Sequence, residues 1–249
     1  MLDQLDLEQV LFLDIETVPE QARLEALDPE WQALWADKAA GRWAADRRAS
    51  DPALTAADLY RSAGLFAEFG RVVCISTAVL QRGQLQVFSF AQADERELLA
   101  AFKQALDTAT TRPDGQDGKR RIEKLCAHNG KEFDFPFLAR RMIVQQVQLP
   151  QLLRIQGRRP WEVPHLDTLE LWKFGDYKAF TSLRLLAHRF GIPSPKDDIS
   201  GADVYRVYYE EHDLARIVAY CQKDVITLVR VLQRMLYHEP IADAQVVQR

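Results

Sequence analysis

The sequence predicts an α/β protein with a mixed central sheet flanked by helices, and three observations support this. Short apolar runs typical of strands occupy residues 10–13, 72–80 and 85–90, and another at 124–127 is followed by helical periodicity. Hydrophobic residues make up 47% of the 249 residues, an ordinary share for a globular protein. Strands come first and then alternate with helices, an order that indicates a mixed sheet.

The first element is a short buried strand over residues 10–13 that ends at Asp14. Residues from about 19 to 67 are rich in Ala, Trp, Asp and Arg, and we expect a helical insertion there, within a single domain that spans residues 1–249. Its large apolar side chains could stack on single-stranded bases or form a small local core, and their helical spacing favours the core. These side chains are Trp31, Leu34, Trp35 and Trp43.

Two strands and a helix are predicted next. A turn with Gly83 separates the apolar runs at 72–80 and 85–90, which is the pattern of a β-hairpin. Acidic residues at 94–97 begin a helix that runs to about Ala109, because negative side chains are favourable in a first helical turn. The remaining predicted elements are a strand at 124–127 and helices at about 133–145, from 165–168 onward, at 182–190 and at 211–238.

The charge of the chain narrows the class of partner. A net charge of −4 argues against a protein that coats nucleic acid indiscriminately. Basic residues nevertheless form local clusters, and such clusters are more often solvated surface than phosphate contacts. The clusters are Lys119-Arg120-Arg121, Arg140-Arg141, and Arg154 with Arg158-Arg159.

The cysteines and the apolar runs bear on localisation. Cys74, Cys126 and Cys221 have no metal-ligand spacing, so we expect buried reduced thiols, as in the cytoplasm. No signal peptide opens the sequence, and no apolar run is long enough to cross a membrane. We therefore expect a cytoplasmic protein without a membrane partner.

Asp14 and Glu16 stand two residues apart just past an apolar run. On a strand, this spacing points both side chains to the same face. Neighbouring carboxylates repel each other unless something positive lies between them, and a metal ion is the simplest such partner. If the strand has ended, both groups instead reach water, and the Asp-x-Glu pattern alone favours that simpler explanation.

Two further acidic positions have local patterns of their own. Tyr220 and Asp224 lie four apart on a predicted helix and share one face, and their apolar neighbours indicate a helix that packs inward. Asp134 lies near the start of a helix, where capping alone would explain a carboxylate. The apolar neighbours are Ile217, Val225, Leu228 and Val231.

Together, three segments resemble the three motifs of the DnaQ-like (DEDD) 3′–5′ exonuclease superfamily. They are Asp14-Ile15-Glu16, Asn129-x-x-x-Phe133-Asp134 and Tyr220-Cys221-x-x-Asp224. Their spelling is similar to the proofreading domains of family B DNA polymerases, and the tyrosine is typical of the DEDDy branch. The histidine branch would have His where Ala219 stands. The best match is a stand-alone exonuclease related to that proofreading domain, from about Leu11 to Leu236, with little likeness in the insertion.

The resemblance implies a ribonuclease H-like fold and a two-metal phosphodiesterase that uses Mg²⁺ or Mn²⁺. Asp14, Glu16 and Asp224 would hold the first ion, Asp14 and Asp134 the second, and Tyr220 would orient the attacking water. The substrate would be a single-stranded 3′ end, with DNA favoured. Residues expected to contact it are Thr17, Asn129, Phe133 and Lys196, the last as a phosphate contact.

Two other functions remain open from the sequence. An exoribonuclease on short RNA would use the same site chemistry, because the distinction rests on contacts to the 2′ position. A non-catalytic nucleic-acid or protein-binding module could share the fold, although it would be expected to have lost its carboxylates. Asp167 and Thr168 are better explained by helix capping, and Asp197-Asp198 by a turn, than as metal ligands.

Overall fold

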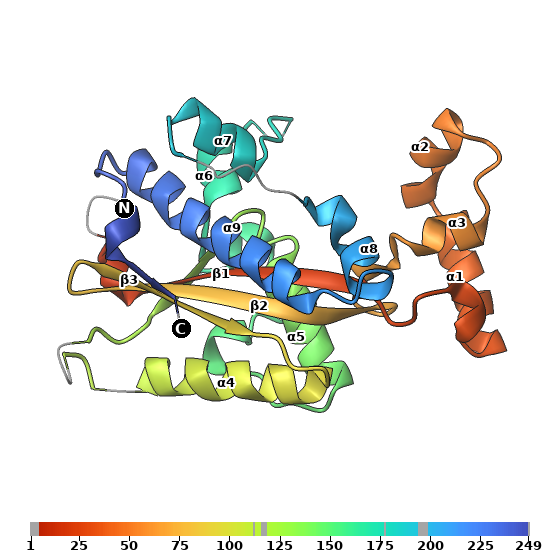
Figure 1. Cartoon of the computed structure of the whole chain (residues 1–249), viewed down its shortest axis with the longest axis horizontal. Helices are drawn as coiled ribbons and strands as arrows, with labels where there is room; N and C mark the ends of the chain where they lie inside the picture. The colour runs from red at the N-terminus through yellow and green to blue at the C-terminus, as the bar shows by residue number, and fades with distance from the viewer. Residues whose placement is uncertain (1–4, 112, 116–118, 177, 194–198, 249) are drawn as a thin grey trace.

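The computed structural model describes residues 5–111, 113–115, 119–176, 178–193 and 199–248. Within these residues the centre is a six-stranded sheet in the order β5-β4-β1-β2-β3-β6 (Figure 1). β1 pairs antiparallel with β2, as β2 does with β3, whereas the β1–β4, β4–β5 and β3–β6 pairs are parallel. The predicted mixed sheet is therefore confirmed. The strands are β1 (Val10–Pro19), β2 (Gly70–Gln81), β3 (Gln84–Phe90), β4 (Lys124–Ala127), β5 (Leu166–Asp167) and β6 (Val246–Gln248).

Helices cover both faces of this sheet. Figure 1 shows α4 and α5 on one face, α9 along the other, and α1 to α3 beyond one end of the sheet. None of the described helices combines the length and apolarity that a membrane span requires. The helices are α1 (Pro29–Ala40), α2 (Arg42–Ser50), α3 (Ala56–Tyr60), α4 (Glu95–Thr111), α5 (Asp134–Val144), α6 (Thr168–Lys173), α7 (Leu183–Arg189), α8 (Val204–Tyr209) and α9 (Leu214–Met235).

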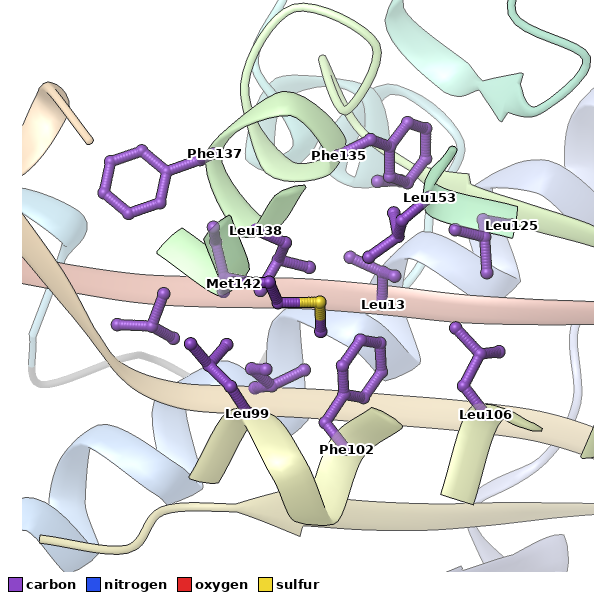
Figure 2. Close-up of a cluster of buried hydrophobic side chains, with 14 of the residues drawn as sticks. Leu13, Leu99, Phe102, Leu106, Leu125, Phe135, Phe137, Leu138, Met142 and Leu153 are labelled. Atoms are coloured by element: carbon purple, nitrogen blue, oxygen red, sulfur yellow. The ribbon is translucent and has the colours of Figure 1, made fainter. Parts of the chain in front are cut away.

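β1 divides its side chains between the two helical layers. Leu11, Leu13 and Ile15 lie in the core beneath α4 and α5. Figure 2 shows part of that core, with Leu13 among side chains such as Phe102 and Leu138. The residues between them alternate to the face that α9 covers. Because one face is apolar, the register of β1 is strongly specified, and so is the position of its polar residues.

The predicted end of the first strand was wrong. β1 does not stop at Leu13 but continues to Pro19, because β2 pairs with it along its whole length. The long predicted C-terminal helix is shorter and starts at Leu214, where the Asp213 side chain accepts a hydrogen bond from the Arg216 N–H and caps it. The helix predicted from residue 165 begins at Thr168, and residues 166 and 167 form β5 instead. β5, α8 and β6 are too short for periodicity to reveal.

The helical insertion has a core of its own, which contains Trp35 and Trp43 as predicted, whereas Trp31 and Leu34 are exposed. Trp35 is fully buried there and its indole N–H donates to the Ala56 carbonyl at 2.7 Å. Its ring packs edge-on against Tyr60 and Phe69, with centroids 5.4 and 5.2 Å away. Trp43 stacks at a tilt on the same ring. This packing accounts for Trp35 and Trp43 without nucleic-acid bases.

Candidate active site

Asp14 and Glu16 lie inside β1, on the face that α9 covers. They are opposite Ser76 and Cys74 of β2, and a β-bulge follows Glu16. Apolar residues precede and follow them on the same face, so α9 packs over this stretch of the strand and takes both carboxylates out of bulk water. Glu16 is buried and Asp14 half-buried. The simpler explanation, in which both groups extend into water past the strand, does not hold.

α9 brings the third motif to the same place. Ile217, Cys221 and Val225 are buried against the sheet, which fixes the rotation of the helix and leaves Tyr220 and Asp224 half-buried beside β1. The Tyr220 hydroxyl donates a hydrogen bond to the Asp224 carboxylate. This pair is the i, i+4 arrangement that the helical spacing predicts.

Cys221 is also part of this cluster. Its thiol lies 3.4 Å from both the backbone carbonyl and Oδ2 of Asp14, and it donates to them. One ligand atom each of Asp14, Glu16 and Cys221 lies within 4.8 Å of the others. The sequence predicts only a buried thiol at Cys221, because nothing in its spacing indicates a carboxylate partner 207 positions away in the chain.

Asp134 joins the cluster from the start of α5. Asp134 is not the N-cap residue, which is Phe133, but the first residue of the helix. Its carboxylate accepts hydrogen bonds from its own backbone N–H at the helix start and from the Ile15 backbone N–H, which lies between the two carboxylates of β1. Asp134 therefore links α5 to the middle of the first motif.

The turn before α5 is shaped for this approach. Asn129 has a left-handed φ of 64°, and its carbonyl accepts the N–H groups of Glu132 and Phe133. A Cβ on Gly130 would lie 2.3 Å from the Cβ of Ala127, so no larger residue fits there without displacing β4. The structure thus gives Asn129 and Gly130 a conformational role in delivering Asp134.

Asp167 holds the same turn from the neighbouring strand. It caps α6 through the Leu169 and Glu170 N–H groups, which confirms the capping interpretation. Its carboxylate also accepts the N–H of Asn129 at 2.9 Å and that of Lys131 at 3.1 Å. One carboxylate thus joins α6 to the turn that carries Asp134, a link between distant segments that no local sequence pattern reveals.

Burial and neighbouring negative charges raise the pKa values of the carboxyl groups in this cluster. Burial raises the pKa of Asp14 well above its ordinary value, and the negative charges of Glu16, Asp224 and Asp134 raise it further. Burial likewise raises the pKa of Glu16, with Asp224 next in effect, and raises that of Asp134 to about 7. Burial and the Asp224 charge raise the pKa of the Tyr220 hydroxyl, which therefore stays protonated at neutral pH.

This set of donors fits divalent cations. Carboxyl groups whose pKa values are raised by burial and by neighbouring negative charges are costly to ionise, and a cation among them would reduce that cost. Carboxylate oxygens are the ligands that hard cations such as Mg²⁺ and Mn²⁺ prefer. RNase H-like nucleases typically use divalent metals, and this acidic cluster is a possible site for them.

The residues expected to contact substrate lie in different settings. The Thr17 hydroxyl donates to the Gly64 carbonyl at 2.8 Å and so ties β1 to the end of the insertion. Phe133 is half-buried and packs on Phe137, with ring centroids 5.3 Å apart. Asn129 is half-buried in the turn described above. Lys196 lies outside the described residues, as do Asp197 and Asp198.

Residues in two of the basic clusters are engaged in ion pairs. Arg141 is buried and paired with Glu95 at 2.5 Å, so its guanidinium cannot meet phosphate. Arg120 is partly exposed and forms ion pairs with Asp6 and Asp114.

Removal of metal is expected to make stability depend on pH. Asp134 titrates near 7 in the folded protein, whereas an unfolded carboxyl titrates near about 4. Between these values the folded state binds more protons, so in excess chelator the melting temperature should fall as pH rises from about 5 to about 8. Saturating Mg²⁺ should raise it most at the higher pH, because the cation then replaces missing protons.

Asp134→Asn is the control for this pH dependence. It cannot ionise, so its melting temperature in chelator should depend less on pH than that of the wild type. Differential scanning calorimetry at several pH values measures both proteins. If the melting temperatures of both proteins change equally with pH, ionisation of Asp134 is not what destabilises the folded state.

Comparisons with known proteins agree with this architecture. No curated protein sequence matches the chain. Among solved structures, the family B DNA polymerase from the hyperthermophilic archaeon Pyrobaculum calidifontis matches with a TM-score of 0.50 and 18% sequence identity. The match covers 92% of this chain but only 24% of the polymerase chain, and at this identity it shows the fold alone. The model of the RNase_H superfamily matches residues 62–236, which is more than half of the sequence, and the chain therefore belongs to the RNase_H superfamily.

Proposed function

We propose that this protein is a metal-dependent 3′–5′ exonuclease that hydrolyses single-stranded nucleic acid, DNA in preference to RNA, to nucleoside 5′-monophosphates. Membership of the RNase_H superfamily indicates a nuclease. The observation that carries the proposal is the proximity of four carboxylates from β1, α5 and α9: burial, and then the charges of the other carboxylates, raise the pKa values of Asp14 and Glu16. The 3′–5′ polarity and the DNA preference rest on the three motifs.

In this proposal the carboxylates share two divalent ions. Asp14, Glu16 and Asp224 would hold one ion, and Asp14 would bridge to a second that Asp134 also holds. When bound, the ions supply positive charge that lowers the pKa of water and offsets the negative charge developing on the phosphate. The hydrogen bond from Cys221 to Asp14 Oδ2 would fix the orientation of the shared carboxylate.

Tyr220 would act as a positioning group and not as a base. Its raised pKa keeps the hydroxyl protonated, so it cannot accept a proton as a phenolate does. A neutral hydroxyl can donate one hydrogen bond and accept another. It donates to Asp224 here, which leaves its oxygen to accept from a water molecule beside the carboxylates.

The direct test is an oligonucleotide assay. Purified protein is incubated with 5′-labelled and 3′-labelled single-stranded DNA and RNA of the same sequence, with Mg²⁺, Mn²⁺ or excess EDTA. We expect the DNA to be shortened stepwise from its 3′ end, and only when metal is present. Faster cleavage of the RNA would assign an exoribonuclease, and full activity in EDTA would exclude the two-metal mechanism. Tight binding without cleavage under any metal condition would assign the binding module.

Tyr220→Phe tests the positioning role. The variant keeps the ring and its packing but lacks the hydroxyl, so the single-turnover rate should fall by about 1–3 kcal/mol of transition-state stabilisation, with the Kd for DNA nearly unchanged. Asp224→Asn should cost far more, because it weakens the proposed metal site. A wild-type rate for Tyr220→Phe would make the tyrosine a packing residue.

A further inference from the structure

Two phenylalanines in the segment that joins α6 to α7 lie exposed to solvent. The side chain of Phe174 is 92% exposed and that of Phe180 is 70% exposed. Burial of an aromatic ring of this size is a major source of stability, and single exposed apolar residues are ordinary on protein surfaces. Two nearly bare rings six positions apart in one short segment are less ordinary.

The backbone at Phe174 adds an independent observation. Phe174 is the C-cap of α6 and has a left-handed φ of 46°, followed by Gly175 at 88°. This conformation suits Gly or Asn and disfavours a residue with a bulky side chain. Phe174 therefore has an unfavourable backbone conformation, and its exposed ring contributes no burial energy that would offset this cost. Strain of this kind is concentrated where a residue serves binding or catalysis.

Hydrogen bonds connect this segment to the turn that carries Asp134. The carbonyl of Thr181, the residue after Phe180, accepts from Nε2 of His128 at 2.9 Å. His128 Nδ1 pairs with the Thr168 hydroxyl, also at 2.9 Å, and burial lowers the histidine pKa, so the ring is neutral and donates through Nε2. Asn129, the next residue, begins the turn that delivers Asp134.

The charge around the two rings suits a polyanion. Between residues 173 and 184 the sequence carries Lys173, Lys178 and Arg184 against the single acid Asp176. Asp176 accepts a hydrogen bond from the Lys178 backbone N–H, and Lys178 is exposed to solvent whereas Lys173 is half-buried. Exposed aromatic rings among cations are the arrangement with which proteins bind single-stranded nucleic acid, because every base has a face that stacks.

From these observations we infer that Phe174 and Phe180 form a stacking platform for bases of a single-stranded nucleic acid whose end lies at the acidic cluster. The inference rests on the proposed function, since it takes the substrate to be a single strand. Lys173 and Lys178 contact its phosphates. The platform holds the strand through stacking without reading base identity, so it contributes affinity and not sequence preference.

The test is binding of a 5′-fluorescein single-stranded DNA 12-mer in EDTA, where no metal-dependent cleavage occurs, followed by anisotropy at constant salt. Phe174→Ala/Phe180→Ala should raise Kd about tenfold or more. Phe174→Tyr/Phe180→Tyr, which keeps both aromatic rings, should bind with the wild-type Kd. Trp161→Ala is the matched control: this ring is 66% exposed, carries Arg159 over its face and lies outside the segment. It should leave Kd unchanged. Circular dichroism verifies that each variant is folded.

An abasic substitution separates stacking from phosphate contact. Oligonucleotides with abasic positions scanned from the 3′ end should bind the wild type more weakly at the stacked positions. The same abasic substitutions should weaken binding to Phe174→Ala/Phe180→Ala very little, because the rings on which those bases would stack are already absent. If abasic positions weaken both proteins equally, or if Phe174→Leu/Phe180→Leu binds as tightly as the wild type, the platform is not one of base stacking and the inference fails.

The outcomes distinguish this inference from the proposed function. If binding depends on the two rings but no hydrolysis occurs in Mg²⁺ or Mn²⁺, the stacking platform is supported and the proposed nuclease function is wrong. Metal-dependent hydrolysis whose KM is the same in Phe174→Ala/Phe180→Ala would retain the nuclease and exclude the platform. A concentration-dependent mass in light scattering that the double variant abolishes, with Kd unchanged, would assign the surface to a second copy of the chain.

Discussion

Asp14→Asn is expected to lower the single-turnover rate on single-stranded DNA by at least about a thousandfold. Asp14 is the carboxylate that all three others act upon, and in the proposed mechanism it is the ligand shared by both ions. Loss of a shared ligand removes several kcal/mol of charge stabilisation at the transition state, since each 1.36 kcal/mol is about a factor of ten in rate. Excess Mn²⁺ should restore little of this.

The same substitution should leave the protein as stable as the wild type or more stable. A buried carboxylate with a raised pKa destabilises the folded state when it ionises, and the amide carries no charge. In chelator at about pH 8, the melting temperature of Asp14→Asn should therefore match or exceed that of the wild type. Glu123→Gln, which removes an exposed carboxylate, is the matched control for charge and should change neither quantity.

A loss of stability with unchanged cleavage by the remaining folded protein would give Asp14 a structural role. Rate and stability must therefore be measured on the same preparations. If the variant is inactive and also melts at a much lower temperature, the loss of activity could come from loss of folded protein. In that case Glu16→Gln, on the same strand, repeats the test at a neighbouring proposed ligand.

The sequence could predict the fold and the acidic positions because both depend on local patterns. The apolar runs of β2, β3 and β4 alternate or cluster in ways that periodicity detects, and the structure has these strands within two residues of the predicted limits. Asp14 and Glu16 share a face because of the period of a strand, and Tyr220 and Asp224 because of the period of a helix.

The parts that could not be predicted depend on contacts between distant segments. Asp134 accepts a hydrogen bond from Ile15, Cys221 donates one to Asp14, and Asp167 holds the turn at Asn129. Each joins residues far apart in the chain, and no pattern near either partner marks it. The extension of β1 beyond Asp14 has the same cause, because pairing with β2 and not local propensity keeps polar residues in the strand.

β1 explains how a rigid site and a stable core are built from one element. Its odd-numbered residues, such as Leu13 and Ile15, are fixed in the core beneath α4 and α5, and the even-numbered Asp14 and Glu16 project from the opposite face. Movement of a carboxylate would therefore require movement of core residues. Sites on strands held in this way keep their geometry better than sites on loops.

The second large effect is expected far from the carboxylates, at Arg141. The guanidinium and the Glu95 carboxylate are both buried and form two hydrogen bonds, with Nε to Oε1 at 2.9 Å and Nη2 to Oε2 at 2.5 Å. Arg141 also donates to the Ala67 carbonyl at the end of the insertion and to Glu20. Glu95 in turn accepts the Val72 backbone N–H at 2.7 Å. This network joins α4, α5, β2 and the insertion.

Arg141→Met should destabilise the protein by about 3–5 kcal/mol, because it leaves the Glu95 charge buried without its counter-charge. The exposed Arg140 beside it on α5 provides the control: Arg140→Met should cost no more than about 0.5 kcal/mol. The double variant Glu95→Gln/Arg141→Met leaves no unpaired buried charge, so it should be more stable than Arg141→Met alone. Its loss of stability should therefore be smaller than the sum of the losses in Glu95→Gln and Arg141→Met. Urea denaturation of the wild type, Glu95→Gln, Arg141→Met and the double variant measures the cycle, with Arg140→Met beside them as the control. Equal losses for Arg140→Met and Arg141→Met, or strict additivity in the double variant, would show that the buried pair does not couple these elements.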